Sequence, residues 1–415
     1  MRRLSLYALL SANSISLIGN QFTIVALPWF VLQTTGSAAK TGLTGFSVAL
    51  PYFLVGIFGG ALIDRFGYRG ISVAADVVSG CAIATVPLLY HTVGLAFWEL
   101  MVLVFFSSFL SIPGLSARRS MLPEIAEASG LRLERVNAAF EGIYPVSAFL
   151  GPPLAGLMIV WMSAGNVLWI DAATFAISAL LVFAGVPRTR RPGQAVHGSR
   201  YIDDLREGID FLRRERLLLY MALSLAISNL LMGPLFSVVL PIYARDVFHS
   251  AKDLGVMLSA FGAGQVAGAI LYGTIGDRIP RRLIWLVGFV GVTIPFFALL
   301  WRPGLLVMVA AMGVAAVTDG PLSPMSVTIR HERIPAQLRG RIFSTFSAVG
   351  TAAIPIGLAA AGFLIGAIGL HRSVWILSIL SAAAALLVIV MPVFREMDAA
   401  GVPIRAPAEA DALPD

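Results

Sequence analysis

Long apolar runs separated by charged or turn-forming residues recur along the whole chain. Runs of about twenty residues are long enough to cross the ~30 Å hydrocarbon layer of a bilayer as α-helices. Backbone groups that face lipid have no water to bond, so helices are the expected form. The predicted membrane-spanning helices cover residues 7–33, 41–62, 71–90, 95–116, 137–160, 166–186, 217–243, 254–274, 283–301, 304–327, 343–368 and 373–393.

The composition supports an all-α membrane protein. Hydrophobic residues make up 58% and charged residues 13% of the 415 positions, against roughly half and a quarter in soluble domains. A soluble core could not bury that much apolar surface. The opening Met-Arg-Arg precedes an apolar run with no small-residue cleavage site, so we expect a retained first helix. The single cysteine, Cys81, falls inside the third predicted helix and excludes an intramolecular disulfide.

The distribution of basic residues predicts the orientation in the membrane. With the N-terminus in the cytoplasm, all but five of the 30 Lys and Arg lie on cytoplasmic segments, as the positive-inside rule requires. The five exceptions are Lys40, Arg245, Lys252, Arg302 and Arg372. We therefore expect a multi-pass membrane protein with both termini cytoplasmic. The net charge of +7 then reflects topology and contact with membrane lipids, and we expect no nucleic-acid partner.

The two halves of the sequence repeat one motif. An offset of 213 residues superposes Pro28 on Pro241, Ser37 on Ser250, Ala38 on Ala251, Gly42 on Gly255, Gly60 on Gly273, Asp64 on Asp277, Arg65 on Arg278 and Arg69 on Arg282. Shared hydrophobicity alone would not produce so many coincidences at one offset, so we infer an internal duplication. The predicted organisation is a six-helix bundle at 1–186, a cytoplasmic linker with an amphipathic helix at 187–216, a second six-helix bundle at 217–395 and a disordered cytoplasmic tail at 396–415.

The repeated core reads GALIDRFGYR at 60–69 and GTIGDRIPRR at 273–282. Its glycines allow a neighbouring helix to approach closely, and its aspartates can accept hydrogen bonds from the amides at a helix N-terminus. Such a cluster could latch and release a cytoplasmic gate, whereas the alternative is a static turn with topology-setting arginines. The candidate gating residues are Gly60, Asp64, Arg65, Gly67, Arg69, Gly273, Asp277, Arg278 and Arg282.

These two segments resemble the signature loop of the major facilitator superfamily. The segments at 17–38, SARRSMLPE at 116–124 and IPAQLRGRIFS at 334–344 are similar to its macrolide-efflux and enterobactin-exporter branch. The resemblance implies twelve transmembrane helices in two pseudo-symmetric bundles, a monomer, and export of a small amphiphilic compound by alternating access. It also implies a proton gradient as the energy source, with no other cofactor.

The segment YIDDLREGIDFLRRERLLL at 201–219 is similar to the same branch. Its residues Ile202, Leu205, Ile209 and Leu212 form one apolar helical face. We expect this face to lie on the membrane interface.

Ionisable residues inside a span cost free energy to insert and are candidates for function. The proton-coupling candidates are Asp319, Asp171, Asp76 and Glu141. Asp319 precedes Gly320 and Pro321, where a broken helix is expected; the alternative is pairing with the nearby arginines of the same segment, Arg330 or Arg333. For Asp76 we favour a static or gating role beside Arg69 and Arg118. For Asp171 the coupling and structural interpretations both stay open, and Glu141 depends on where its helix begins.

Polar residues along the predicted first helix form a stripe that a lipid-facing helix would not show. The stripe consists of Asn13, Ser16, Asn20 and Thr23, and we expect it to face a central cavity. Gln21, Asn229 and Gln265 are further candidates to orient a substrate, with interhelical hydrogen bonding as the alternative.

Other functions fit the sequence less well. The five histidines are scattered through predicted loops without metal-ligand spacing, so we expect neither an enzyme nor a metal site. A siderophore exporter, a lysophospholipid flippase of the same fold and a receptor without transport activity stay as alternatives. Residues 98–113 contain only Glu99 as a charge, so the helix-4 arginine common in proton-linked drug exporters is absent.

Overall fold

The computed structural model describes residues 2–187 and 201–398, except for the side chains of residues 2, 52–53, 55–66 and 201–205. Helices make up its regular structure, and these residues contain no strand. The helices are α1 (Arg2–Thr35), α2 (Ala38–Thr92), α3 (Phe97–Ser120), α4 (Leu122–Ser129), α5 (Leu133–Met162), α6 (Ala164–Gly185), α7 (Tyr201–Arg214), α8 (Arg216–Pro234), η1 (Leu235–Val239), α9 (Leu240–Tyr243), η2 (Ala244–Phe248), α10 (Ala251–Ile275), η3 (Gly276–Arg278), α11 (Arg281–Leu300), α12 (Leu305–Asp319), α13 (Leu322–Arg333), η4 (Ala336–Leu338), α14 (Arg339–Thr351), α15 (Ala353–Ile368), α16 (Leu370–Val390) and η5 (Pro392–Met397).

The predicted spans all fall on helices. Among the described residues, eleven helical stretches are long and apolar enough to cross a membrane. The twelfth predicted span, 41–62, lies in the first segment of α2, which Gly67 separates from the second segment. Gly67 has φ 71° and ψ 162°, a conformation that only glycine adopts easily, so the chain kinks there. The all-α, twelve-helix prediction is therefore confirmed.

Several helices extend beyond the predicted limits because the helical backbone continues past the apolar run. The fourth predicted helix was expected to end at residue 116, yet α3 continues to Ser120 and carries Arg118 and Arg119 in its last turn. Cations at a helix C-terminus interact favourably with the helix dipole, which explains why these arginines do not end the helix.

One compact unit contains Met1–Val196, Gly233–Gly262 and Ile354–Ser373. In it α1 packs against α5 and α6, and α2 packs against α3 and α6. Its core includes Leu9, Met121, Phe140 and Val182, each at most 3% exposed. Segments from both sequence repeats therefore belong to this one unit.

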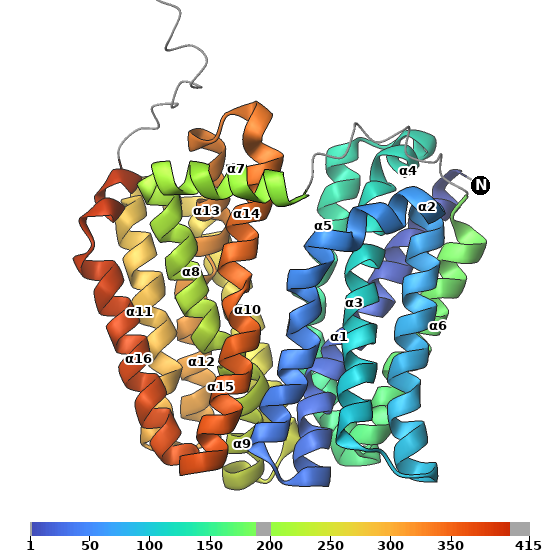
Figure 1. Cartoon of the computed structure of the whole chain (residues 1–415), viewed down its shortest axis with the longest axis horizontal. Coiled ribbons are helices and arrows are strands. Elements are labelled where there is room, and N and C mark those ends of the chain that lie inside the picture. Colours follow the sequence, from blue (N-terminus) through green and yellow to red (C-terminus); the bar gives the residue numbers. More distant parts are fainter. Residues whose placement is uncertain (1, 188–200, 399–415) are drawn as a thin grey trace, which may run out of the picture. The chain divides into compact units, whose positions relative to one another are not determined.

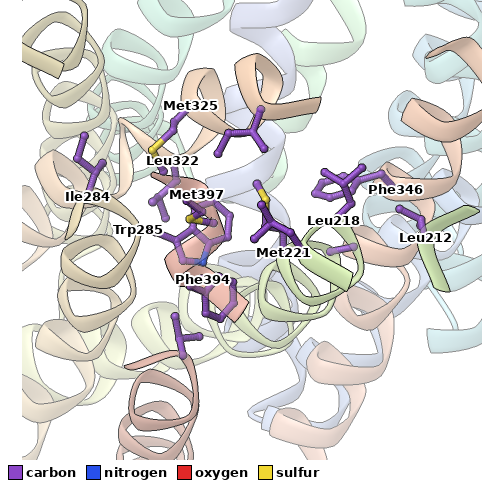
Figure 2. Packing of buried hydrophobic residues seen from close by; sticks show 14 of the residues in the cluster. Leu212, Leu218, Met221, Ile284, Trp285, Leu322, Met325, Phe346, Phe394 and Met397 are labelled. Atoms are coloured by element: carbon purple, nitrogen blue, oxygen red, sulfur yellow. The ribbon is translucent and has the colours of Figure 1, made fainter. Parts of the chain in front are cut away.

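The second unit contains His197–Met232, Ala263–Ala353 and Val374–Asp415. Figure 2 shows its apolar core, where Trp285 lies beside Phe394 and Met397. Trp285 is 1% exposed, and its ring centroid lies 5.3 Å from that of Phe289. The ring of Trp285 also lies 6.3 Å from that of Phe394, so the core connects α11 with η5, and Met221 of α8 belongs to the same cluster.

The linker helix α7 lies across the ends of α8 and α14 (Figure 1). The prediction that its apolar face contacts the membrane interface is wrong for Leu212, which is 1% exposed within the protein core. Gly208 packs directly on Thr345 of α14, and Glu207 forms a 2.6 Å ion pair with Arg341. A glycine on this face allows α7 to approach protein closely, which is why the face covers α14. Ile202 and Leu205 lie outside the described side chains.

Candidate functional site

Two helices from different repeats, α2 and α15, cross in the first unit, and glycine residues lie at the point of contact. A Cβ atom on Gly42 would overlap the carbonyl oxygen of Leu358. A Cβ atom on Gly362 would lie 2.8 Å from the carbonyl oxygen of Ala38. The obstructing atoms belong to the backbone, so no side-chain rotation could relieve them. The crossing lies at the predicted extracytoplasmic ends of both helices.

A second crossing of the same kind joins α5 and α10. A Cβ atom on Gly255 would overlap the carbonyl oxygen of Pro152, and one on Gly156 would lie 2.6 Å from the carbonyl oxygen of Ala251. Nearby, the hydroxyl of Ser259 donates a 2.6 Å hydrogen bond to the carbonyl oxygen of Phe149.

The two crossings are one contact made twice. An offset of 213 residues converts Ala38 and Gly42 into Ala251 and Gly255. An offset of 206 converts Pro152 and Gly156 into Leu358 and Gly362. We call Gly42, Gly156, Gly255 and Gly362 the glycine seal. The backbones of the paired helices are therefore in direct contact at both crossings. Sequence reasoning noticed Gly42 and Gly255 as repeats but missed their contact partners.

Asp76 and Arg118 form a buried ion pair that joins α2 and α3. Arg118 is 3% and Asp76 4% exposed. Arg118 Nε donates to Ser72 Oγ at 3.1 Å, and Ser178 Oγ of α6 donates to Asp76 Oδ2 at 2.8 Å. The predicted pairing with Arg118 is therefore seen. Arg69 does not join it, because its Nη2 donates to the carbonyl oxygen of Phe183.

Asp171 lies fully buried between α6 and α1. Thr23 Oγ1 donates to Asp171 Oδ2 at 2.5 Å, and Thr174 Oγ1 lies 3.2 Å from Oδ1. Within the described part of the chain no arginine or lysine pairs with this carboxyl. Its side-chain partners among the described residues are hydroxyl groups, which distinguishes Asp171 from Asp76.

Asp319 lies on α12 and contacts α10. Its Oδ2 accepts a 2.8 Å hydrogen bond from Gln265 Nε2. The side chain is half-buried, so it stays more accessible than Asp171. The expected helix break at Gly320 and Pro321 is shallow: Gly320 has φ −50° and ψ −40°, and Pro321 has φ −65° and ψ −25°, both helical.

The arginines considered as alternative partners of Asp319 are engaged elsewhere. Arg333 pairs with Glu215 at 2.6 Å. The Arg330 guanidinium lies 4.5 Å from the ring centroids of both Phe343 and Phe346.

The predicted cavity residues divide into different environments. Asn13 is 0% exposed, and neither of its amide atoms has a hydrogen-bond partner. Gln21 packs on Gly151, and Asn20 is half-buried. Asn229 Nδ2 donates to the carbonyl oxygen of Gly350 at 2.9 Å. Interhelical bonding therefore accounts for Asn229 and Gln265, whereas Asn13 keeps an unused hydrogen-bonding group.

The structure describes the side chains of the second copy of the signature loop, but only part of those of the first copy. Gly60, Asp64 and Arg65 lie outside the residues whose side chains are described. In the second copy Asp277 and Arg278 lie in η3, and the backbone N–H of Arg282 donates to Asp398 at 3.1 Å. The close helix approach expected at Gly273 is not seen, because its surroundings are open within 4 Å of a Cβ atom.

Two further ion pairs involve the second signature copy and the candidate Glu141. In the second signature copy, Arg281 forms a two-pronged ion pair with Glu332 at 2.6 and 2.8 Å, a contact that the motif comparison missed. Glu141 pairs with Arg119 at 2.9 Å, with both side chains more than half exposed. An exposed pair of this kind contributes little to stability.

Comparison with known proteins agrees with this fold. The model of the Major Facilitator Superfamily matches residues 9–251 and 217–410. The multidrug efflux pump Tap of Mycobacterium tuberculosis is 31% identical over 400 residues, which cover 95% of each chain. Macrolide efflux protein A of Streptococcus pyogenes is 21% identical over 375 residues, covering 89% of this chain and 91% of that protein. The crystal structure of the nucleoside transporter NupG superposes with a TM-score of 0.78 at 13% identity, covering 93% and 98% of the two chains. The chain therefore belongs to the Major Facilitator Superfamily and is a multi-pass membrane transporter of its efflux branch.

Proposed function

We propose that this protein exports small amphiphilic compounds in exchange for protons, by alternating access. The observation that carries the proposal is the glycine seal, a contact made once by each repeat pair at the predicted extracytoplasmic ends. A transporter with inverted or duplicated repeats closes one side of the membrane while substrate binds from the other. The described state is then one end point of the cycle, and opening the seal is the step that releases substrate.

The relatives guide the substrate class. Tap is a multidrug efflux pump and macrolide efflux protein A exports macrolides by name, so we propose a macrolide-like drug or natural product. The moving bodies are the two six-helix halves, 1–186 and 217–395, joined by the 187–216 linker. Both termini lie in the cytoplasm in this proposal, and the protein acts as a monomer in a bacterial inner membrane.

Asp319 is the first candidate for the coupling proton. It is half-buried, and among the described residues it accepts a hydrogen bond only from the neutral amide of Gln265 on α10. A carboxyl inside a membrane that lacks a countercharge is suited to reversible protonation. Asp171 is the second candidate, because hydroxyl groups alone hold it. Asp76 is bound to Arg118 and Glu141 lies at the surface, so neither is favoured.

Asn13 is the favoured substrate-contact residue on α1. It is buried, and both atoms of its amide lack a hydrogen-bond partner. A buried polar group left unpaired costs about 1–3 kcal/mol, so a polar group of the substrate would repay that cost. Asn20, which is half-buried and belongs to the same predicted polar stripe, is the second candidate.

Replacing Asp319 by Asn should uncouple the transporter. In everted vesicles with an imposed pH gradient, a macrolide added to wild-type protein should dissipate the gradient. Asp319→Asn at equal expression should fall to the level of vesicles without the protein, because the amide cannot carry a proton. Asp253→Asn, a change at an acid predicted to lie outside the membrane, should transport like the wild type.

Three other outcomes would change the proposal. Normal proton flux in Asp319→Asn, together with its loss in Asp171→Asn, would move the coupling role to Asp171. A response to siderophores alone would change the substrate class. If no compound moved protons but a headgroup-labelled lysophospholipid crossed the bilayer, proton-driven drug export would be rejected in favour of a flippase.

A further inference from the structure

A groove of about 580 Å³ runs along the outside of the first unit between the second segment of α2 and α6. Small side chains form its floor: Gly80, Cys81, Ala84, Ala172, Ala173 and Ala176. Larger exposed side chains form its rims, with Trp169 39%, Leu180 65% and Phe183 62% exposed. This wall of α2 and α6 is not part of the glycine seal or of the candidate proton site at Asp319.

The groove has the length of a lipid chain. From Trp169 to Phe183 it follows α6 for about 21 Å at a rise of ~1.5 Å per residue. One leaflet of the hydrocarbon layer is about 15 Å thick, half of the ~30 Å core. A single acyl chain that lies along the groove would therefore be covered over the depth of its leaflet.

A cation lies at the predicted cytoplasmic end of the groove. Arg69 packs over the ring of Phe183 with its guanidinium carbon 5.1 Å from the centroid. Its Nη2 bonds the carbonyl oxygen of Phe183, and its Nε has no partner. Among the residues that the structure describes, no carboxylate forms an ion pair with Arg69. This positive charge, at the predicted cytoplasmic end of the helices, complements an anionic phosphate.

We propose that this groove binds one phospholipid of the predicted cytoplasmic leaflet, with an acyl chain along the small residues and the phosphate against Arg69. A cationic amphiphile fits less well, because the one acid in the lining, Asp76, is already neutralised by Arg118. A second copy of the chain also fits less well, because a helix about 10–12 Å across cannot enter the space between two contacting helices.

The sole cysteine provides the probe. Cys81 is exposed and lines the groove, so a bound acyl chain should shield its thiol from a maleimide. In purified wild-type protein in detergent, phosphatidylglycerol should slow the modification of Cys81 in a saturable way. Diacylglycerol with the same chains should require about tenfold higher concentration, because it lacks the phosphate. Arg69→Gln should remove this difference between the two lipids.

Two further variants separate occupation of the groove from general lipid solvation. Ala176→Phe should fill the groove and abolish protection by either lipid. Ala383→Phe, at an exposed position of α16, should leave protection unchanged. Melting temperatures of all variants should match the wild type, which excludes unfolding as the cause.

The proposal fails if diacylglycerol protects Cys81 of the wild type as well as phosphatidylglycerol does. It also fails if no lipid protects, or if protection depends on protein concentration, as for a second copy. Protection by a transported macrolide at lower concentration than phosphatidylglycerol would assign the groove to substrate instead. Export by the wild type is measured separately, so failure of the lipid site leaves the proposed function standing.

Discussion

Export should stop when alanine replaces Gly42 and Gly255 together, although the protein should still fold and insert. Each new Cβ atom would overlap a backbone carbonyl oxygen across a helix crossing. Overpacking costs about 1–3 kcal/mol per site, and here it penalises only the state in which the seal is closed. Two sites together should disfavour that state by roughly 30-fold or more, since ~1.4 kcal/mol is tenfold. A transporter that cannot close one side cannot complete its cycle.

The measurement is the initial rate of macrolide export per molecule of inserted protein. Gly142→Ala is the matched control, because Gly142 lies on α5 like Gly156 but has open space around its Cβ position. We expect the control to export at the wild-type rate. Wild-type export by the Gly42→Ala, Gly255→Ala double variant would show that the crossings need not close.

Removing the charge of Asp76 should strongly destabilise the first unit. In Asp76→Asn the guanidinium of Arg118 would stay buried without a counterion, which costs about 3–5 kcal/mol. Replacing both partners, with Asp76→Leu and Arg118→Met, should recover most of this loss, because buried ion pairs are commonly replaced by apolar residues without cost. Thermal unfolding of Asp76→Leu, Arg118→Met and the double variant measures the coupling energy between the two side chains.

The second repeat has aromatic residues where the first has Ser72 and Asp76. At the 213-residue offset Ser72 and Asp76 correspond to Trp285 and Phe289, which are 1% and 4% exposed in the core of the second unit. At this offset Arg118 corresponds to the exposed His331, so the second repeat has no ion pair at this site. Equal melting temperatures for Asp76→Asn and the double variant would contradict the idea that the uncompensated charge is the source of the loss.

Local patterns in the sequence predicted the helices well. Apolar runs located every span, and the duplicated loop indicated both the repeat and Gly67, where the structure kinks. The pairing of Asp76 with Arg118 could also be anticipated, since both lie near the same predicted end of adjacent helices. These features depend on residues that are near one another along a helix or along the membrane normal.

Contacts between distant helices were not visible in the same way. The partners in the seal, Gly156 and Gly362, share an offset of 206 rather than 213, and Pro152 corresponds to Leu358, so few identities mark the repeat. Glycine is also common in membrane helices for ordinary packing. The apolar face of α7 is a similar case. Periodicity predicted the helix, but the same apolar residues would suit a face that contacts lipid and a face that packs on protein.

The most direct test of alternating access through the seal is a reversible disulfide across it. A Cβ atom on Gly366 would lie 3.6 Å from that of Ala39, within the range of about 3.5–4.5 Å that a disulfide requires. In a Cys81→Ser background, Ala39→Cys with Gly366→Cys should form a disulfide on oxidation. Neither thiol should then react with a thiol reagent. If the seal must open in every cycle, export stops on crosslinking and a reductant restores it, while each single-cysteine variant is unaffected by oxidant. Export at an unchanged rate by fully crosslinked protein would contradict it.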